Sequence, residues 1–520
     1  MNGDGESRRA GWREWGGLAL LALPTMLLGL DVTALYLVVP SLAVDLDPSA
    51  TEMLWIMDAY GFLIAGLLIT MGTLGDRFGR RRLLMIGVAL FAVASVAVAF
   101  APTVLWLIAA RALLGVAGAT LMPSTLSLIS TMFTDPRQRA SAIGVWATSF
   151  GLGMAAGPIV GGVLTAALWW GAVFLIAVPV ALLVLAGAPT LLPERRPTIG
   201  PPTGRLDLLS AGLSLAAMLP VIYAIKHAAA HGIDLPSVAA ALVGGVAAVA
   251  FVRRQLYLTE PLLDVKLFTG PTFSAALSVL LVGLVGFGGA MFLVTQYLQL
   301  VAGFSPTTAG LWMGPPALAM LVGAIGAPLL ARRISPGVVM AATLALSLVG
   351  YALLSLAGTA SNGAVVAGFA FVYLGLGVIA ALGTDIVVGA APRDKAGSAA
   401  ALSETVQELG IATGVALLGS FTTAVYRSSI EVPTGLSASV AATYSDSLAG
   451  ASSLASRISG DALEHARTVF NIGLNTASAA AGAAIAIASL ACFVTLRHLR
   501  PLGAVDRQAE PAVSPPGSER

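Results

Sequence analysis

Apolar residues along this chain gather into long uninterrupted runs instead of the short alternating patterns of soluble domains. A run of about 20 apolar residues can cross a hydrocarbon core of about 30 Å, and it must be helical there because its backbone polar groups have no other partners. The pattern therefore predicts an all-α integral membrane protein with fourteen transmembrane helices. They cover residues 16–39, 53–74, 83–101, 103–129, 140–166, 170–188, 207–229, 236–252, 272–297, 307–330, 337–357, 362–391, 397–424 and 467–495.

The composition excludes several soluble classes of protein. Of the 520 residues, 57% are hydrophobic and 10% are charged, whereas soluble domains have about 25% charged residues. The net charge of +2 is too small to indicate a polyanionic partner. The single cysteine, Cys492, cannot form an intramolecular disulfide. A soluble enzyme, a disordered protein and a nucleic-acid-binding protein are therefore excluded.

Basic residues between the predicted helices indicate how the chain is oriented. With a cytoplasmic N-terminus, 23 of the lysines and arginines fall inside and four fall outside, namely Lys226, Arg427, Arg457 and Arg467. Basic loop residues stay in the cytoplasm. We therefore expect a multi-pass protein of a bacterial plasma membrane with both termini in the cytoplasm.

A short internal repeat divides the chain. Residues 136–140 and 392–396 share the pattern Pro-Arg-x-basic-Ala at an offset of 256 residues, and repeated halves are typical of transporters. The predicted parts are an N-terminal tail (1–15), a six-helix bundle (16–188), a linker (189–206), two inserted helices (207–252), a cytoplasmic loop (253–271), a second six-helix bundle (272–495) and a C-terminal tail (496–520). The second bundle includes an extracellular segment (425–466), which is either a short amphipathic cover over the outer opening or a flexible loop.

Ionisable residues inside the predicted helices are candidates for function, because a charge in hydrocarbon needs a partner or a water-filled cavity. Asp31, Asp58 and Arg111 are predicted in the outer half of the membrane as proton-coupling residues, although Asp58 could instead be an outer-vestibule group. Glu404 and Glu408 lie one turn apart and share a helix face. Because burial favours the neutral form of a carboxyl group, a proton and a lipophilic cation can compete for one carboxylate. All four acids are candidate substrate-binding residues.

The segment between the second and third predicted helices reads GTLGDRFGRRRL over residues 72–83. Its glycines permit a tight turn, and an aspartate beside four arginines can form ion pairs or cap a neighbouring helix. An ordinary basic anchor would only fix the orientation. The residues of this segment that could do more than an anchor are Gly72, Asp76, Arg77, Gly79, Arg80 and Arg81.

The fifth predicted helix has glycines on one face. Gly153, Gly157 and Gly161 lie four residues apart, which lets a neighbouring helix approach closely. Pro158 removes a backbone hydrogen bond and is expected to bend the helix. With Gly162, these residues form a second candidate motif, for which ordinary glycine-mediated packing is the simpler interpretation.

Together with Leu30-Asp31-Val32-Thr33 and the ETVQELG stretch at 404–410, these motifs resemble those of the major facilitator superfamily. The resemblance covers about residues 16–495 and is strongest to its fourteen-helix drug:proton antiporters, which export quaternary ammonium compounds and dyes. It implies the major facilitator fold with two six-helix bundles plus two inserted helices. It also implies a gate at residues 72–81, an antiporter motif at residues 153–162 and a link between Arg111 and proton coupling. In pumps of this type, an extra acidic residue in the tenth helix is associated with divalent cations. The tenth predicted helix here has none, so the resemblance implies monocationic more than dicationic substrates.

The sequence thus predicts a secondary active transporter and not an enzyme. We expect a proton-coupled antiporter that exports lipophilic, mainly cationic drugs, dyes or antiseptics by alternating access. The alternatives are a dedicated exporter of one endogenous metabolite or antibiotic and, more remotely, a membrane sensor or enzyme on this scaffold. The sequence has no Walker motif and no metal-ligand spacing, so we expect no cofactor and no metal, with the proton gradient as energy source. The expected partners are the transported cations, protons and membrane lipids, with no nucleic acid, and we expect a monomer.

Overall fold

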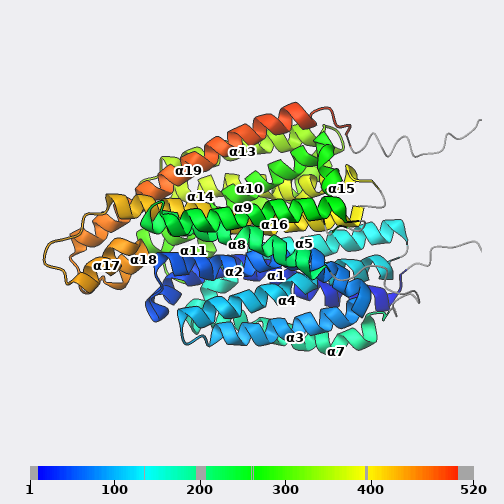
Figure 1. Ribbon diagram of the computed structural model, residues 1–520, viewed down its shortest axis with the longest axis horizontal. Helices are drawn as coiled ribbons and strands as arrows, with labels where there is room; N and C mark the ends of the chain where they lie inside the picture. Colours follow the sequence, from blue (N-terminus) through cyan, green and yellow to red (C-terminus); the bar gives the residue numbers. More distant parts are fainter. Residues whose placement is uncertain are drawn as a thin grey trace, which may run out of the picture.

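The fold is a bundle of long helices that run along one axis (Figure 1). The computed structural model describes residues 10–133, 135–194, 207–258, 261, 263–392 and 396–501. Within these ranges there is no β-strand, and fourteen helical segments are long and apolar enough to cross a membrane. The predicted all-α class and the predicted number of spans are therefore confirmed.

Each span begins and ends at defined residues, and four spans are built from more than one element. The elements in chain order are α1 (Trp12–Leu46), α2 (Ala50–Phe78), α3 (Arg80–Ala99), α4 (Val104–Met132), α5 (Pro136–Ala167), α6 (Ala172–Leu175), α7 (Ala177–Leu191), α8 (Leu208–His231), α9 (Leu235–Tyr257), η1 (Val265–Thr269), α10 (Pro271–Gln296), η2 (Tyr297–Val301), α11 (Pro306–Trp312), α12 (Gly314–Ala331), α13 (Pro336–Ser355), α14 (Asn362–Val378), η3 (Ile379–Gly383), α15 (Thr384–Gly389), α16 (Ala396–Ser429), α17 (Ala438–Asp446), α18 (Leu448–Ser453) and α19 (Gly460–Leu496).

The helices pack as two groups, which we call the N-bundle (α1–α7) and the C-bundle (α10–α16 and α19). In the N-bundle, α1 packs against α5, and α4 packs against α2 and α3. In the C-bundle, α10 packs against α16, and α13 packs against α14 and α19. The two bundles meet where α2 contacts α16 and α5 contacts α11. Following the predicted orientation, we call the end where α2 begins the outer end and the opposite end the inner end.

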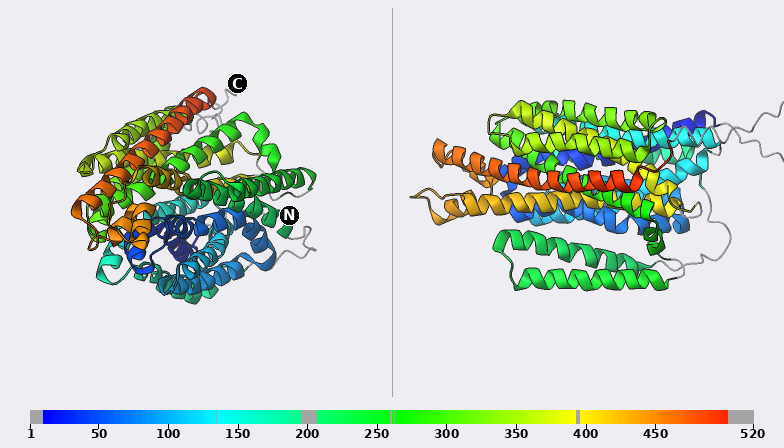
Figure 2. Two further views of the ribbon diagram at one scale, coloured as in Figure 1. Left: turned by 60° about the vertical axis from the view of Figure 1, so that its left-hand side comes forward. Right: turned by 90° about the horizontal axis from the view of Figure 1, so that it is seen from above.

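The hairpin α8–α9 lies beside the two bundles (Figure 2). At its inner end, Arg254 Nη2 donates to Asp207 Oδ1 at 2.9 Å, and at its outer end His227 Nε2 lies 2.9 Å from Asp234 Oδ2. The backbone N–H of Ser237 donates to Asp234 at the start of α9, and this hydrogen bond, with that of the Ser237 side chain, lowers the pKa of Asp234 to about 2. Polar contacts at both ends therefore hold α8 and α9 together.

Several helix ends differ from the predicted ones because capping groups, not the limits of the apolar runs, end helices. The first span was predicted to end at residue 39, but α1 continues through Pro40 to Leu46. The last helix was expected to begin at residue 467, but α19 begins at Gly460, where Ser459 Oγ accepts a hydrogen bond from the N–H of Ala462. The predicted extracellular segment 425–466 therefore contains the ends of α16 and α19 together with α17 and α18.

Candidate functional site

Asp31 of α1 and Arg111 of α4 lie side by side in the interior of the N-bundle. Arg111 Nη1 donates to Asp31 Oδ2 at 2.9 Å, and the side chains are 2% and 7% exposed, respectively. Arg111 Nε also donates to the carbonyl oxygen of Ile56 at 3.3 Å, and the guanidinium lies 4.7 Å from the centre of the Tyr60 ring. A buried arginine requires such partners because it stays charged. The structure thus brings the two residues together, and their role in proton coupling stays a prediction.

Asp58 of α2 pairs with Lys226 of α8, a residue that the count of basic residues had placed on the outside. Lys226 Nζ lies 2.8 Å from Asp58 Oδ2, and both side chains are fully buried. The same ammonium lies 4.1 Å from the centre of the Trp55 ring. The assignment of Lys226 to the outside was wrong because α8 packs against α2 and turns this lysine into the protein. The signal that could have found the pair is a lysine inside an apolar run, which requires an acidic partner.

A small central cavity brings three charged side chains together. Residues of α1, α2, α4 and α16 line it, and they include Asp58, Arg111 and Glu408. Glu408 is 5% exposed, and Glu404 is half-buried one turn nearer the inner end, outside the cavity wall. Among the described side chains, neither glutamate forms an ion pair. The acids predicted to bind substrate are therefore of two kinds: Asp31 and Asp58 have basic partners, and the glutamates do not.

The glycine face of α5 packs directly against α1. A Cβ atom built on Gly153 would lie 2.0 Å from the carbonyl oxygen of Met26, and one on Gly157 would lie 2.0 Å from Thr33 Oγ1. One on Gly161 would lie 2.9 Å from an oxygen atom of α1. These separations are shorter than any contact that a side-chain carbon tolerates, so α1 and α5 can approach this closely only where α5 has glycine.

The remaining residues of the second motif face the C-bundle. A Cβ atom on Gly162 would lie 2.2 Å from the carbonyl oxygen of Pro306 in α11, and Thr307 Oγ1 donates to the Gly162 carbonyl at 3.2 Å. Pro158 lies inside α5. A Cβ atom built on Gly310 of α11 would lie 2.5 Å from the carbonyl oxygen of Pro158. One helix, α5, therefore has close contacts with both bundles.

The predicted gate segment is mostly helical. The helix α2 continues to Phe78, Gly79 has a φ of +96° that favours glycine, and α3 begins at Arg80. Arg81 forms an ion pair with Glu194 and donates to two carbonyl oxygens near the end of α7. The basic run therefore fixes the inner end of α3 to the inner end of α7.

Two other gate residues, Asp76 and Arg77, have side chains outside the described part of the structure. The predicted capping by Asp76 therefore stays a prediction. A Cβ atom on Gly72 would make an ordinary contact of 3.8 Å with Pro123. Sequence reasoning missed Glu194, which pairs with Arg81 and with Arg82 Nε at 2.9 Å, because its distance along the chain gave no sign of their proximity.

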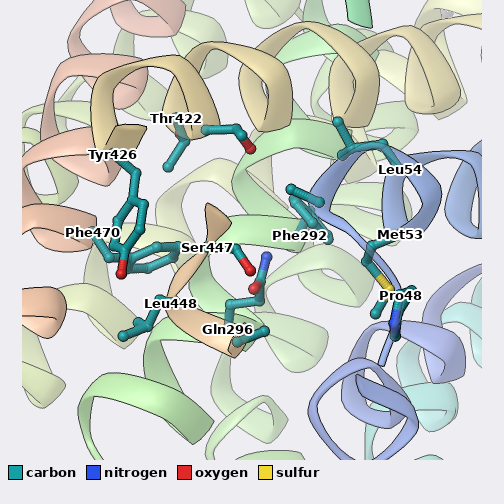
Figure 3. Close-up of a pocket in the computed structure, with 13 residues that line it drawn as sticks. Pro48, Met53, Leu54, Phe292, Gln296, Thr422, Tyr426, Ser447, Leu448 and Phe470 are labelled. Atoms are coloured by element: carbon teal, nitrogen blue, oxygen red, sulfur yellow. The ribbon is translucent and has the colours of Figure 1, made fainter. Parts of the chain in front are cut away.

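At the outer end, α17 and α18 cover the bundle. Figure 3 shows a pocket beneath α18 that is lined by side chains from α2, α10, α16 and α19 as well. Asp446 Oδ2 accepts a hydrogen bond from the N–H of Ala50 at 2.7 Å, and Asp446 also pairs with Arg427 of α16. The hydroxyl of Tyr444 donates to the carbonyl oxygen of Ala462 in α19 at 2.8 Å. Of the two alternatives for this segment, the structure favours a packed cover.

Buried charged side chains within two packed groups of membrane-spanning helices are typical of a membrane transporter. The family model described as Major Facilitator Superfamily matches residues 21–415. The chain belongs to the major facilitator superfamily, as its motifs had indicated.

Named relatives and a solved structure agree with this family. The multidrug efflux pump LfrA of Mycolicibacterium smegmatis is 41% identical over 503 residues, which cover 96% of this chain and 99% of LfrA. The methyl viologen resistance protein SmvA of Salmonella typhimurium is 32% identical over 492 residues, which cover 93% of this chain and 99% of SmvA. A solved structure is also similar: the crystal structure of a bacterial homologue of the human lysosomal transporter Spinster, in an inward-facing and unoccupied conformation. The TM-score is 0.64 and the sequence identity is 19%, and the match covers 94% of this chain and 98% of the chain in that structure. The last similarity shows the fold alone.

Proposed function

We propose that this protein is an efflux pump of a bacterial plasma membrane that exports lipophilic, mainly cationic drugs, dyes or antiseptics in exchange for protons. The name of LfrA, a multidrug efflux pump, supports export of drugs, and that of SmvA indicates resistance to methyl viologen. The observation that carries the cationic preference is Glu408, a buried carboxyl group in the wall of the central cavity that has no basic partner among the described side chains.

The charge of the cavity supports this substrate class. Asp31 is neutralised by Arg111 and Asp58 by Lys226, so Glu408 and its neighbour Glu404 carry the charge that is not balanced locally. At an effective dielectric constant near 20, a cation about 4 Å from one ionised carboxylate gains about 4 kcal/mol. A neutral compound gains no such attraction, so the cavity favours cations.

Proton coupling follows from the same carboxyl groups. A proton that binds to Glu408 removes the charge that attracts the cation, so the two ligands exclude each other from one site. Alternation between an inner and an outer opening then produces antiport. Toward the outer end, Gly162 of α5 packs against Pro306 of α11, and Asp446 of the outer cover accepts a hydrogen bond from the N–H of Ala50 in α2. Both contacts support a state in which the outer side is closed. The predicted orientation then makes the cytoplasm the side of substrate entry.

The test is ethidium transport into inside-out vesicles or proteoliposomes, with an imposed proton gradient and after an ionophore has removed it. Gradient-dependent uptake supports antiport, and uptake that is unaffected by the ionophore contradicts it. Glu408→Gln should reduce ethidium transport by about tenfold or more and transport of a neutral drug much less. Equal losses for both compounds would indicate a structural role for Glu408. A panel of unrelated cations separates a multidrug pump from the alternative, an exporter dedicated to one metabolite, because the latter would move none of them.

A further inference from the structure

The inserted helix α8 contributes a charge to the core of the transporter. Lys226 Nζ lies 2.8 Å from Asp58 Oδ2, with both side chains fully buried, and the Trp55 ring lies against the same ammonium at 4.1 Å. Neither charged group has a further hydrogen bond within the described part of the chain. An ammonium held between a carboxylate and an aromatic ring has the same surroundings as a bound cationic ligand.

Asp58 belongs to the central cavity as well as to this pair, because it lies in the same cavity wall as Arg111 and Glu408. The charged groups near it come from four other helices. Arg111 of α4 and Glu408 of α16 share the cavity wall with it, Lys226 of α8 is its direct partner, and Asp31 of α1 is the partner of Arg111. Two of the acids are neutralised by basic side chains. Lys226 is therefore the residue that removes Asp58 from the set of carboxylates available to a substrate.

Packing alone gives no reason for a charged pair at this position. Beside the pair, α8 packs against α2 and α16 through an apolar cluster that includes Phe62, Ile222 and Ala412. A buried ion pair contributes little net stability, and apolar residues of similar volume commonly replace one without loss. The pair is better explained by its position in the cavity wall than by a need to hold the helices together.

We infer that Lys226 is a specificity-determining residue: it acts as a built-in cation that occupies Asp58 and thereby restricts the substrates to compounds with a single positive charge. This inference rests on the proposed function. A monocation needs only Glu408, the carboxylate of the cavity wall that has no basic partner among the described side chains, whereas a dication needs a second negative charge in that wall. The other carboxylate there, Asp58, is already neutralised. Removal of the ammonium should make Asp58 available.

The experiment compares transport of ethidium, a monocation, with transport of methyl viologen, a dication, in proteoliposomes. For Lys226→Met, the ratio of kcat/KM for methyl viologen to that for ethidium should rise by about tenfold relative to the parent. Lys226→Arg retains the charge and should retain the parent ratio. The double variant Asp58→Asn with Lys226→Met removes both charges and should return the ratio to the parent value.

An unchanged ratio in an active Lys226→Met protein would overturn the inference and leave the proposed function intact. Failure of the parent to move ethidium would instead contradict the proposed function. If Lys226→Met cannot be produced, Asp58→Asn and the double variant provide the decisive comparison by ethidium affinity in detergent. Asp58→Asn leaves an unneutralised ammonium beside the cavity, so it should bind ethidium about tenfold more weakly than the double variant. Equal affinities would refute the role of Lys226.

Discussion

The contact between α1 and α5 permits a sharp test, because two glycines of α5 that are two residues apart differ completely in their surroundings. A Cβ atom on Gly153 would lie 2.0 Å from the carbonyl oxygen of Met26 and 2.9 Å from the backbone nitrogen of Leu30. A Cβ atom on Gly151 would have no neighbour within 4 Å. The same substitution, glycine to alanine, is therefore a clash at one position and harmless at the other.

The magnitude follows from the geometry. Because the atoms that obstruct Gly153→Ala are backbone atoms, no side chain can rotate away, and α1 must move by more than 1 Å, roughly the shortfall from a normal contact. Overpacking of this kind costs about 1–3 kcal/mol, whereas alanine in place of an unobstructed helical glycine stabilises by up to about 1 kcal/mol. The two variants should thus differ by about 1–4 kcal/mol in stability.

The measurement is thermal unfolding of both variants in the same detergent, followed by ethidium transport in proteoliposomes. Gly153→Ala should unfold at a lower temperature than the parent, and Gly151→Ala should equal or exceed the parent. Transport by Gly153→Ala should also fall, because α1 carries Asp31 and its displacement separates Asp31 from Arg111. Equal unfolding temperatures for the two variants would refute the close packing of α1 on α5.

Three further outcomes follow from the site. Asp31→Asn should abolish uphill transport while part of the substrate binding survives; vesicles of this variant that still concentrate ethidium would show that Asp31 is not a coupling residue. The affinity for a monocation, measured in detergent at several pH values, should fall as the pH falls, because protonation of Glu404 or Glu408 removes the attracting charge; an affinity independent of pH would contradict this. Asp446→Asn should loosen the outer cover. A cysteine introduced as Leu448→Cys should then react with a membrane-impermeant maleimide about threefold faster or more. An unchanged labelling rate would show that the Asp446 contacts do not hold the cover closed.

Much of the fold could be predicted because the membrane requires every backbone polar group of a spanning segment to be hydrogen-bonded within the protein. An apolar run in hydrocarbon must be helical, so the fourteen spans followed from the runs alone. The depth of Asp31 and Arg111 along their helices likewise placed them at comparable levels, and the structure joins them at 2.9 Å. Depth along a helix can be counted from the sequence.

Lateral packing could not be predicted in the same way. A helix whose apolar residues are spread over all its faces, as in α8, gives no periodic signal of which face meets which neighbour. The partner of Lys226 was therefore found only in the structure. The cover formed by α17 and α18 was left undecided for a related reason, since its Ser-, Ala- and Gly-rich sequence has no strong apolar stripe and depends on hydrogen bonds such as that of Tyr444 to Ala462.

The position of α8 between α2 and α16 determines how the hairpin travels when the two bundles rock against each other. Toward α2 its contacts are directional: the Lys226 ion pair, and a hydrogen bond from Ser214 Oγ to the carbonyl oxygen of Gly66 at 3.3 Å. Toward α16 it meets the apolar side chains Leu409, Ala412 and Ala416, past which it can slide without breaking a polar contact. The hairpin should thus move together with the N-bundle and slide against α16 of the C-bundle. Spin labels on α9 and α3 would then keep a constant separation through the transport cycle, while labels on α9 and α13 would report the full amplitude of the motion.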